Sequence, residues 1–184
     1  MVEIARRAAT ALSTPWLKVL PPAVRLAFNG DATAQRAALA VWGTPFPEDA
    51  CRSNVHSTHA SLWLGPDEYL MLDFAREPDA GALLAALENA LAHVPHALVD
   101  VSHRQFALEV SGPFATTILS GACPLDLDMA AFPVGMCTRT VFAKADIVLW
   151  RRGSDTFHIE VWRSFSGYVT GVLQEIAAEF YPGR

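Results

Sequence analysis

The sequence predicts an α+β fold of two related halves, each with the order strand, helix, hairpin, helix. Segments with alternating apolar residues are interleaved with segments of helical periodicity, and this order occurs twice in 184 residues. Helices beside antiparallel strands form the α+β arrangement. We expect an N-terminal extension over residues 1–20, a first half over 21–95 and a second half over 96–184, packed together as one domain.

The first half opens with a strand and a helix. Residues 24–28 alternate as in a half-buried strand. Asp31 has the side chain of an N-cap and begins a helix to about Trp42, and Gly43 is the residue type that ends helices. A loop with two prolines is expected over 43–57.

A hairpin and a second helix complete this half. Strands over 60–64 and 69–74 are joined by Gly65-Pro66-Asp67-Glu68, a turn in which the proline fixes φ. Asp79 is the expected cap of the next helix. The apolar face of that helix consists of Leu83, Leu84, Leu87 and Leu91.

The second half repeats this order. A strand over 104–110 leads through Ser111-Gly112-Pro113 into a short helix that ends near Ser120. Three strand-like segments follow, and a turn over 152–155 joins the last two of them. These segments are 138–143, 146–151 and 156–162.

The last helix has the clearest apolar stripe in the chain. Ser164 is its predicted cap, and Pro182-Gly183 end it. The stripe consists of Phe165, Val169, Val172, Leu173, Ile176 and Phe180.

The composition indicates either an unusually large core or a surface that a partner covers. Apolar residues make up 52% of the chain and charged residues 18%, whereas a typical soluble domain has roughly 25% charged residues. A surface so poor in charge is typical of a protein interface. The net charge is −5 and the Lys and Arg residues are scattered, which argues against binding of nucleic acid.

Cysteine usage and hydropathy predict a cytoplasmic protein. The three cysteines have no CxxC spacing, which favours a reducing compartment. The first residues lack the apolar run of a signal peptide. No stretch approaches the roughly 20 apolar residues that span a bilayer, so no membrane association is expected.

Few residues have the pattern of a catalytic or cofactor site. The HxxH pairs His56/His59 and His93/His96 have no obvious third zinc ligand, so no metal is expected. The sequence contains no nucleophile elbow, no GxGxxG after a strand and no P-loop, so a flavin would need another chain for its binding. Cys123 lies among apolar residues and is interpreted as structural.

Two polar residues are candidates for binding. Asp100 follows a strand-like segment over 97–101. It either accepts hydrogen bonds from the Ser102 and His103 backbone in an Asx-turn or belongs to a polar cluster at a ligand pocket or interface. Arg163 precedes the last helix, and the dipole at a helix N-terminus favours anions, so the helix does not explain a cation at this position. Arg163 is therefore a candidate for binding a carboxylate or an acidic residue of a partner.

The five tryptophans are assigned by their surroundings. Trp63, Trp150 and Trp162 lie in strand-like segments and are expected in the core. Trp16 lies in a proline-flanked segment outside the two halves and is therefore interpreted as an interface residue.

Four motifs give the chain a family resemblance. Their order and intervals, from about residue 24 to residue 180, resemble the gamma subunits of heterotetrameric sarcosine oxidase. The same region is more distantly similar to the folate-binding domain of the glycine-cleavage T-protein, in which an aspartate-x-serine-histidine run also precedes a strand, a glycine and a helix. The motifs are Trp63-Leu64-Gly65-Pro66-Asp67-Glu68-Tyr69-Leu70, Asp100-Val101-Ser102-His103-Arg104, Cys123-Pro124-Leu125-Asp126-Leu127, and Arg163-Ser164-Phe165 with Tyr168.

The resemblance implies a T-protein-type fold and a place in a complex with alpha, beta and delta subunits. Such a complex oxidises sarcosine to glycine, forms hydrogen peroxide and passes the methyl carbon to tetrahydrofolate as 5,10-methylenetetrahydrofolate. FAD, FMN, NAD and tetrahydrofolate are expected on the other subunits, with no cofactor and no catalytic residue on this chain. An isolated chain is expected to self-associate through its uncovered apolar surface.

The alternative function is a stand-alone folate-binding or one-carbon-transfer protein. Asp100, Asp146 and Arg163 serve this function if they face one cavity. The T-protein family has two adjacent aspartates where this chain has Ala145-Asp146, so Asp146 is the single acid at this place. A binding protein that kept the fold without either partner is a third alternative.

Overall fold

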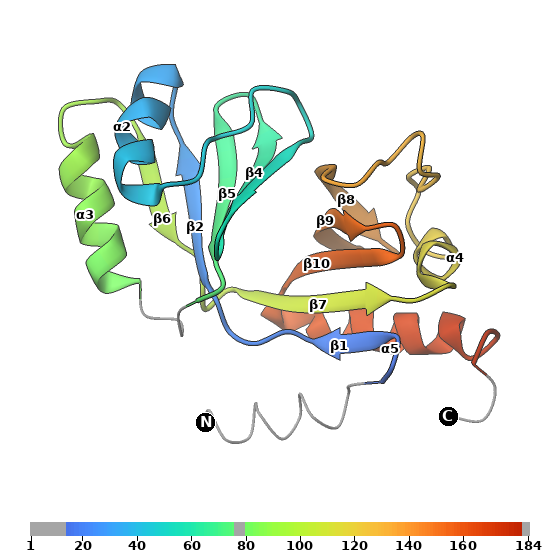
Figure 1. Ribbon diagram of the computed structural model, residues 1–184. Helices are drawn as coiled ribbons and strands as arrows, with labels where there is room; N and C mark the ends of the chain where they lie inside the picture. Colours follow the sequence, from blue (N-terminus) through green and yellow to red (C-terminus); the bar gives the residue numbers. More distant parts are fainter. Residues whose placement is uncertain (1–13, 76–79, 182–184) are drawn as a thin grey trace. The chain divides into compact units, whose positions relative to one another are not determined.

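The computed structural model describes residues 14–75 and 80–181, which divide into two compact units (Figure 1). Unit 2 comprises residues 22–105, and unit 1 comprises the residues up to Pro21 together with those from Phe106 onward. The chain contains β1 (Leu17–Val19), β2 (Val24–Asn29), α2 (Ala32–Trp42), β3 (Ser53–His56), β4 (His59–Gly65), β5 (Glu68–Asp73), α3 (Gly81–Leu91), β6 (Ala97–Asp100), β7 (Gln105–Ser111), α4 (Ala115–Ser120), β8 (Cys137–Phe142), β9 (Ala145–Gly153), β10 (Thr156–Trp162), the 3-10 helix η1 (Arg163–Phe165) and α5 (Ser166–Ala177).

Each unit contains one five-stranded sheet, and the two sheets have the same topology. The strand order is β3-β4-β5-β2-β6 in unit 2 and β8-β9-β10-β7-β1 in unit 1. Each unit runs strand, helix, three strands, helix, as β2, α2, β3 to β5 and α3 in one and β7, α4, β8 to β10 and α5 in the other. The predicted α+β class and its two related halves are therefore confirmed, with three strands where a hairpin was expected.

The boundary between the units differs from the predicted halves. The sequence placed it at residue 95, whereas the structure places it at Gln105. The reason is that β6 pairs with β2, which joins it to the sheet of unit 2. The edge position next to β7 in unit 1 is instead taken by β1, which comes from the segment that was expected to be an N-terminal extension outside the two halves.

Helix α2 begins and ends at the predicted residues. The Asp31 carboxylate accepts hydrogen bonds from the N–H groups of Thr33 and Ala34 at 2.8 and 3.0 Å, which satisfies two first-turn donors. At the other end Gly43 has φ 74° and donates its N–H to the Leu39 carbonyl. Glycine takes this left-handed conformation without a Cβ penalty.

The core of unit 2 lies between its helices and its sheet. Trp42 at the end of α2 is 1% exposed, and its indole N–H donates to the Ser61 hydroxyl at 2.8 Å. Asp79, the predicted cap of α3, lies outside the described residues. The predicted apolar face of α3 is confirmed at Leu83, Leu87 and Leu91, which are buried, and Leu84 is half-buried against the same cluster.

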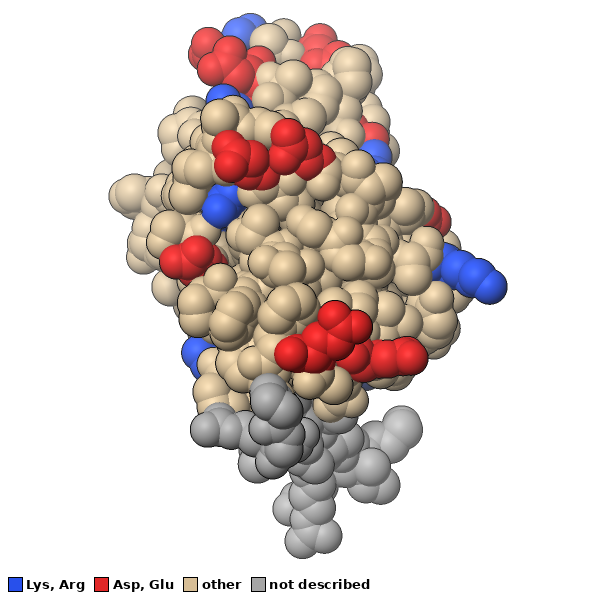
Figure 2. All heavy atoms as spheres, turned by 90° about the vertical axis from the view of Figure 1, so that its right-hand side faces the viewer, with Lys and Arg blue, Asp and Glu red and all other residues tan. Residues whose placement is uncertain are grey.

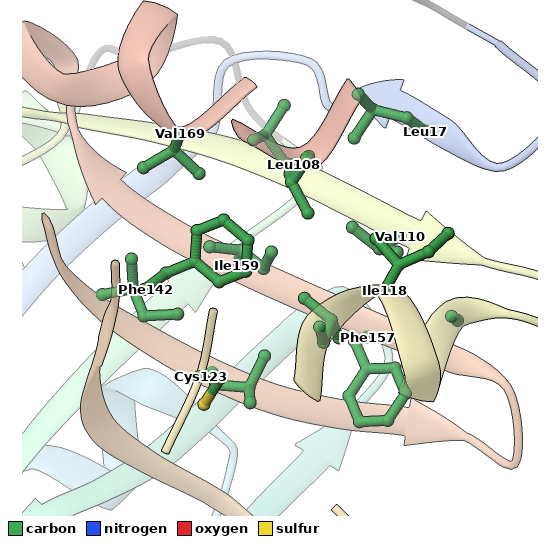
Figure 3. Close-up of a cluster of buried hydrophobic side chains, with 14 of the residues drawn as sticks. Leu17, Leu108, Val110, Ile118, Cys123, Phe142, Phe157, Ile159 and Val169 are labelled. Carbon is green, nitrogen blue, oxygen red and sulfur yellow. The ribbon is translucent and has the colours of Figure 1, made fainter. Parts of the chain in front are cut away.

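The core of unit 1 is drawn in Figure 3. Leu108 and Val110 of β7 and Ile159 of β10 face Ile118 of α4 and Val169 of α5. All five side chains are fully buried, and burial of each such side chain stabilises a fold by about 1.5–3 kcal/mol. No helix within the described residues is long and apolar enough to cross a membrane.

The structure corrects the assignment of Trp16 to an interface. This residue is 5% exposed and packs into the core of unit 1, where its ring stacks on that of Tyr181 with 5.8 Å between centroids. Its carbonyl accepts a hydrogen bond from the Ser111 N–H at 2.8 Å, next to the pairing of β1 with β7. Trp16 is therefore a core residue of this chain.

The start of the last helix also differs from the prediction. Ser164 is not its cap, because η1 precedes α5 and no side chain caps the first turn of α5. The Ser166 hydroxyl instead donates to the Arg163 carbonyl at 2.8 Å. Phe165 in this extra turn and Trp162 at the end of β10, both expected in the core, are 42% and 49% exposed.

Candidate functional site

The first sequence motif forms the turn between β4 and β5. Asp67 has φ 57°, and its carbonyl accepts a hydrogen bond from the Gly30 N–H at 2.9 Å, which ties the turn to the segment before α2. The Tyr69 hydroxyl donates to the Pro47 carbonyl at 3.4 Å. Burial raises the pKa of Tyr69, and the Asp67 charge adds to this effect, so the phenol stays a neutral donor. These contacts give the motif a structural role.

The second motif forms an Asx-turn after β6. The Ser102 N–H donates to the Asp100 carboxylate at 2.8 Å. The Ser102 hydroxyl accepts the N–H of Arg25 at 2.9 Å, and the Val101 N–H donates to the Arg25 carbonyl at 2.8 Å. His103 is exposed beside this turn. The motif therefore fastens the chain leaving β6 onto β2, as the first of its two interpretations expected.

The third motif enters the long connection between α4 and β8. Cys123 is 6% exposed in the core of unit 1 (Figure 3), with its sulfur 3.9 Å from the Thr140 hydroxyl. After Pro124, the carboxylate of Asp126 accepts the N–H of Asp128 at 2.9 Å. The carboxylate of Asp128 in turn accepts the N–H of Ala130 at 2.8 Å. Two successive turns thus shape this connection.

Arg151, which sequence reasoning missed, anchors the same connection. Its side chain is buried, and Nη1 donates to the carbonyls of Leu127 and Phe132 at 3.0 and 2.8 Å. Its Nε donates to the Ser154 carbonyl at 3.2 Å. The guanidinium also lies 4.8 Å from the ring centroid of Phe157. The adjacent arginines Arg151 and Arg152 could have indicated a buried cation in the sequence. Adjacent residues of a strand point to opposite faces of the sheet, so one of the two arginines must point inward.

A buried ion pair in β10 was missed as well. His158 Nε2 donates to a Glu160 carboxylate oxygen at 2.7 Å, and both residues are 1% exposed. They alternate with core residues such as Ile159, so alternation alone assigns them to a solvated face. Buried polar side chains need hydrogen-bond partners, which gives the pair a structural explanation.

The residues proposed for folate are divided between the units. Asp100 belongs to unit 2, and its carboxylate serves the Asx-turn. Asp146 and Arg163 belong to unit 1 and are exposed, and Asp146 lies opposite Val141 in the pairing of β9 with β8. The Asp100 carboxylate is thus engaged in a turn, and we derive no chemical step through tetrahydrofolate.

One histidine of each HxxH pair contributes to packing. His59 stacks on Trp42 with 4.1 Å between ring centroids, and its Nδ1 lies 2.7 Å from the carbonyl oxygen of the same residue. His96 Nδ1 lies 2.8 Å from the Val94 carbonyl oxygen. Across residues 14–75 and 80–181, no three His, Cys, Asp or Glu side chains are placed to hold a metal ion.

Apolar side chains reach the surface of unit 1 in several places. One is the junction of β10, η1 and α5, where the fourth sequence motif lies and where Tyr168 is 40% exposed. Another is the connection between α4 and β8. Figure 2 faces the side of the molecule on which α4 lies, and it shows that uncharged residues cover most of that side. This surface has the composition of a docking face rather than of a catalytic cleft.

Sequence comparisons relate the chain to one family. A model described as "Sarcosine oxidase, gamma subunit family" matches residues 25–179. The chain is 36% identical over 140 residues to the sarcosine oxidase subunit gamma of Corynebacterium sp. (strain P-1), covering 75% of this chain and 66% of that protein. It is 33% identical over 150 residues to the subunit gamma of an Arthrobacter species, covering 80% of this chain and 72% of that protein.

Structural comparisons agree with the sequence comparisons. A chain of the heterotetrameric sarcosine oxidase from Corynebacterium sp. U-96, in complex with pyrrole 2-carboxylate, is similar with a TM-score of 0.85 and 27% identity. The match covers 98% of this chain and 96% of that chain. The glycine cleavage system aminomethyltransferase T from Bartonella henselae shares the fold, with a TM-score of 0.62 and 15% identity, over 85% of this chain and 44% of that one.

Proposed function

The chain belongs to the sarcosine oxidase gamma subunit family, and from this premise we propose that it is the gamma subunit of a heterotetrameric sarcosine oxidase. In this proposal it assembles with alpha, beta and delta subunits and contributes no catalytic residue. The complex demethylates sarcosine oxidatively to glycine, with hydrogen peroxide and 5,10-methylenetetrahydrofolate as further products. FAD, FMN, NAD and tetrahydrofolate are bound by the other subunits.

The observation that carries this proposal is the match to a chain of a heterotetrameric enzyme over nearly the whole length of both chains. A likeness at both ends and throughout the fold supports an equivalent place in an assembly. A match confined to one unit would support only a common fold.

The geometry of the motifs supports an accessory role. Asp67, Asp100, Ser102 and Asp126 make hydrogen bonds that close turns or join neighbouring segments. Catalytic groups instead converge on a place that a substrate can occupy. The exposed apolar side chains of unit 1 supply the kind of surface that a partner subunit covers. The three free cysteines are consistent with a cytoplasmic assembly, which is part of the proposal.

Co-expression tests the proposal. The chain is produced with candidate alpha, beta and delta chains of the same organism, and the mass of the product is measured by light scattering after size exclusion. We expect one complex that contains all four chains and forms hydrogen peroxide only when sarcosine is added. Failure of the chain to join that complex contradicts the proposal.

The isolated chain provides the second arm of this test. We expect it to form no peroxide from sarcosine and to show no saturable binding in a titration with tetrahydrofolate, because the Asp100 carboxylate already serves the Asx-turn. Turnover by the chain alone would contradict the accessory role. Tight folate binding would favour the stand-alone one-carbon function.

A further inference from the structure

The connection between α4 and β8 is held in one conformation by a buried cation. Arg151 donates to the carbonyls of Leu127 and Phe132 within the connection and to that of Ser154 in the β9–β10 turn. One guanidinium therefore joins two surface segments that are distant in sequence. A surface segment fixed in this way loses little conformational entropy when a partner binds it.

A second contact adds the start of α4 to this region. The N–H of Gly112 donates to the Asp155 carbonyl at 2.9 Å, so the segment before α4 meets the same β9–β10 turn. Phe114 follows two residues later, is 37% exposed, and stacks on Phe180 with 5.3 Å between centroids. We call the resulting region the loop surface. It consists of Phe114, Asp126, Asp128, Met129, Val134 and Asp155.

The loop surface combines apolar side chains with acidic ones. Met129 and Val134 are 41% and 51% exposed. Asp126, Asp128 and Asp155 are exposed and flank the segments that Arg151 anchors. Figure 2 shows acidic residues set among uncharged ones on this side of unit 1.

The stretch of sequence that carries Asp126 and Asp128 contains no basic residue. No Lys, Arg or His occurs between Arg104 and Arg139 in the sequence. The neighbouring Arg152 has its guanidinium 5.0 Å from the ring centroid of Trp150, whose ring also lies 5.6 Å from that of the buried His158. The acidic side chains of the loop surface therefore have few basic residues near them in the sequence.

We propose that the loop surface docks a partner subunit at a place where Lys or Arg side chains border an apolar pocket that receives Met129 and Val134. This inference rests on the proposed function, because it needs a heteromeric assembly. Complementary charge selects such a partner and raises its association rate. A second copy is a poorer occupant, because a two-fold contact brings the same acidic groups of both copies together.

Binding of variant chains to the other three subunits tests the inference. The chain is immobilised, and the co-expressed alpha, beta and delta subunits are passed over it at several salt concentrations. The double variant Met129→Ser/Val134→Ser is expected to bind at least about tenfold more weakly, since central apolar contacts dominate interface energies. The matched control is Val55→Ser/Val99→Ser in unit 2, which alters side chains of similar exposure, 53% and 55%, and is expected to bind like the wild type.

Isosteric neutralisation tests the charge. In Asp126→Asn/Asp128→Asn/Asp155→Asn the amide oxygens keep the turn hydrogen bonds while the charges are lost. We expect a slower association and a weaker dependence of its rate on salt. Circular dichroism and thermal melting establish that each variant is folded as the wild type is.

The outcomes separate this inference from the proposed function. Wild-type chain that does not bind the three subunits contradicts the proposed function. Wild-type binding that the loop-surface variants leave unchanged overturns the inference alone. Variants that reduce self-association of the isolated chain but leave binding to the other subunits intact assign the surface to a second copy, which also overturns it.

Discussion

Replacing Arg151 with methionine is expected to destabilise the chain by about 2–4 kcal/mol. The side chain is 3% exposed and donates to two buried carbonyls, those of Leu127 and Phe132, at 3.0 and 2.8 Å. Hydrogen bonds from a charged donor contribute about 1.5–3 kcal/mol each, so the two together contribute about 3–6 kcal/mol. Methionine fills a similar volume and avoids the cost of burying a cation, which offsets part of the loss.

Urea denaturation of the purified chain, followed by tryptophan fluorescence and far-ultraviolet circular dichroism, measures this effect. Arg151→Lys is expected to lose an intermediate amount, because an ammonium group keeps the charge but not the planar fork that reaches several carbonyls. The control is Arg152→Met at the exposed neighbouring position, where the loss is expected to stay within about 1 kcal/mol. An Arg151→Met chain as stable as the wild type would refute the anchoring role.

Substitutions at three further positions test the fold. Trp16→Ala is expected to lower stability by about 3–5 kcal/mol, as for other large core truncations, without a separate loss of subunit binding; a binding loss at unchanged stability would return Trp16 to an interface. Asp31→Ala is expected to cost about 1 kcal/mol in thermal unfolding and Asp31→Asn almost nothing, so equal losses would contradict the cap. Glu160→Ala is expected to cost about 3–5 kcal/mol of unfolding free energy because it leaves His158 buried without the Glu160 carboxylate. Glu160→Gln retains an acceptor for His158 and is expected to cost less. Equal unfolding free energies for these two variants would contradict the pairing of His158 with Glu160.

Several elements of the fold could be predicted because their signals are local. The carboxylate of Asp31 and the left-handed conformation of Gly43 delimit α2 through groups within one helical turn. The Asx-turn at Asp100 likewise depends on a hydrogen bond to the second residue along the chain. Such interactions form between neighbours in sequence, so the order of residues is sufficient to find them.

Other elements were missed because their partners are distant in sequence. β1 is three residues long and is a strand only because it pairs with β7, about ninety residues later in the sequence. β3 lies in a segment expected to be a loop and exists through its pairing with β4. Trp16 was placed outside the core for the same reason, because the stacking partner that buries it, Tyr181, is at the other end of the chain.

The α+β class, the repeated order of elements, the family of the chain and the low charge that suits a subunit could all be inferred from the order of residues. These follow from periodicity, capping residues, motif order and composition, which are properties of neighbouring residues or of the whole chain. Which polar side chains are buried became known from the three-dimensional fold. Arg151, His158 and Glu160 occupy strand positions that alternation assigns equally well to solvent, because the period of a strand separates its two faces but does not say what covers each of them.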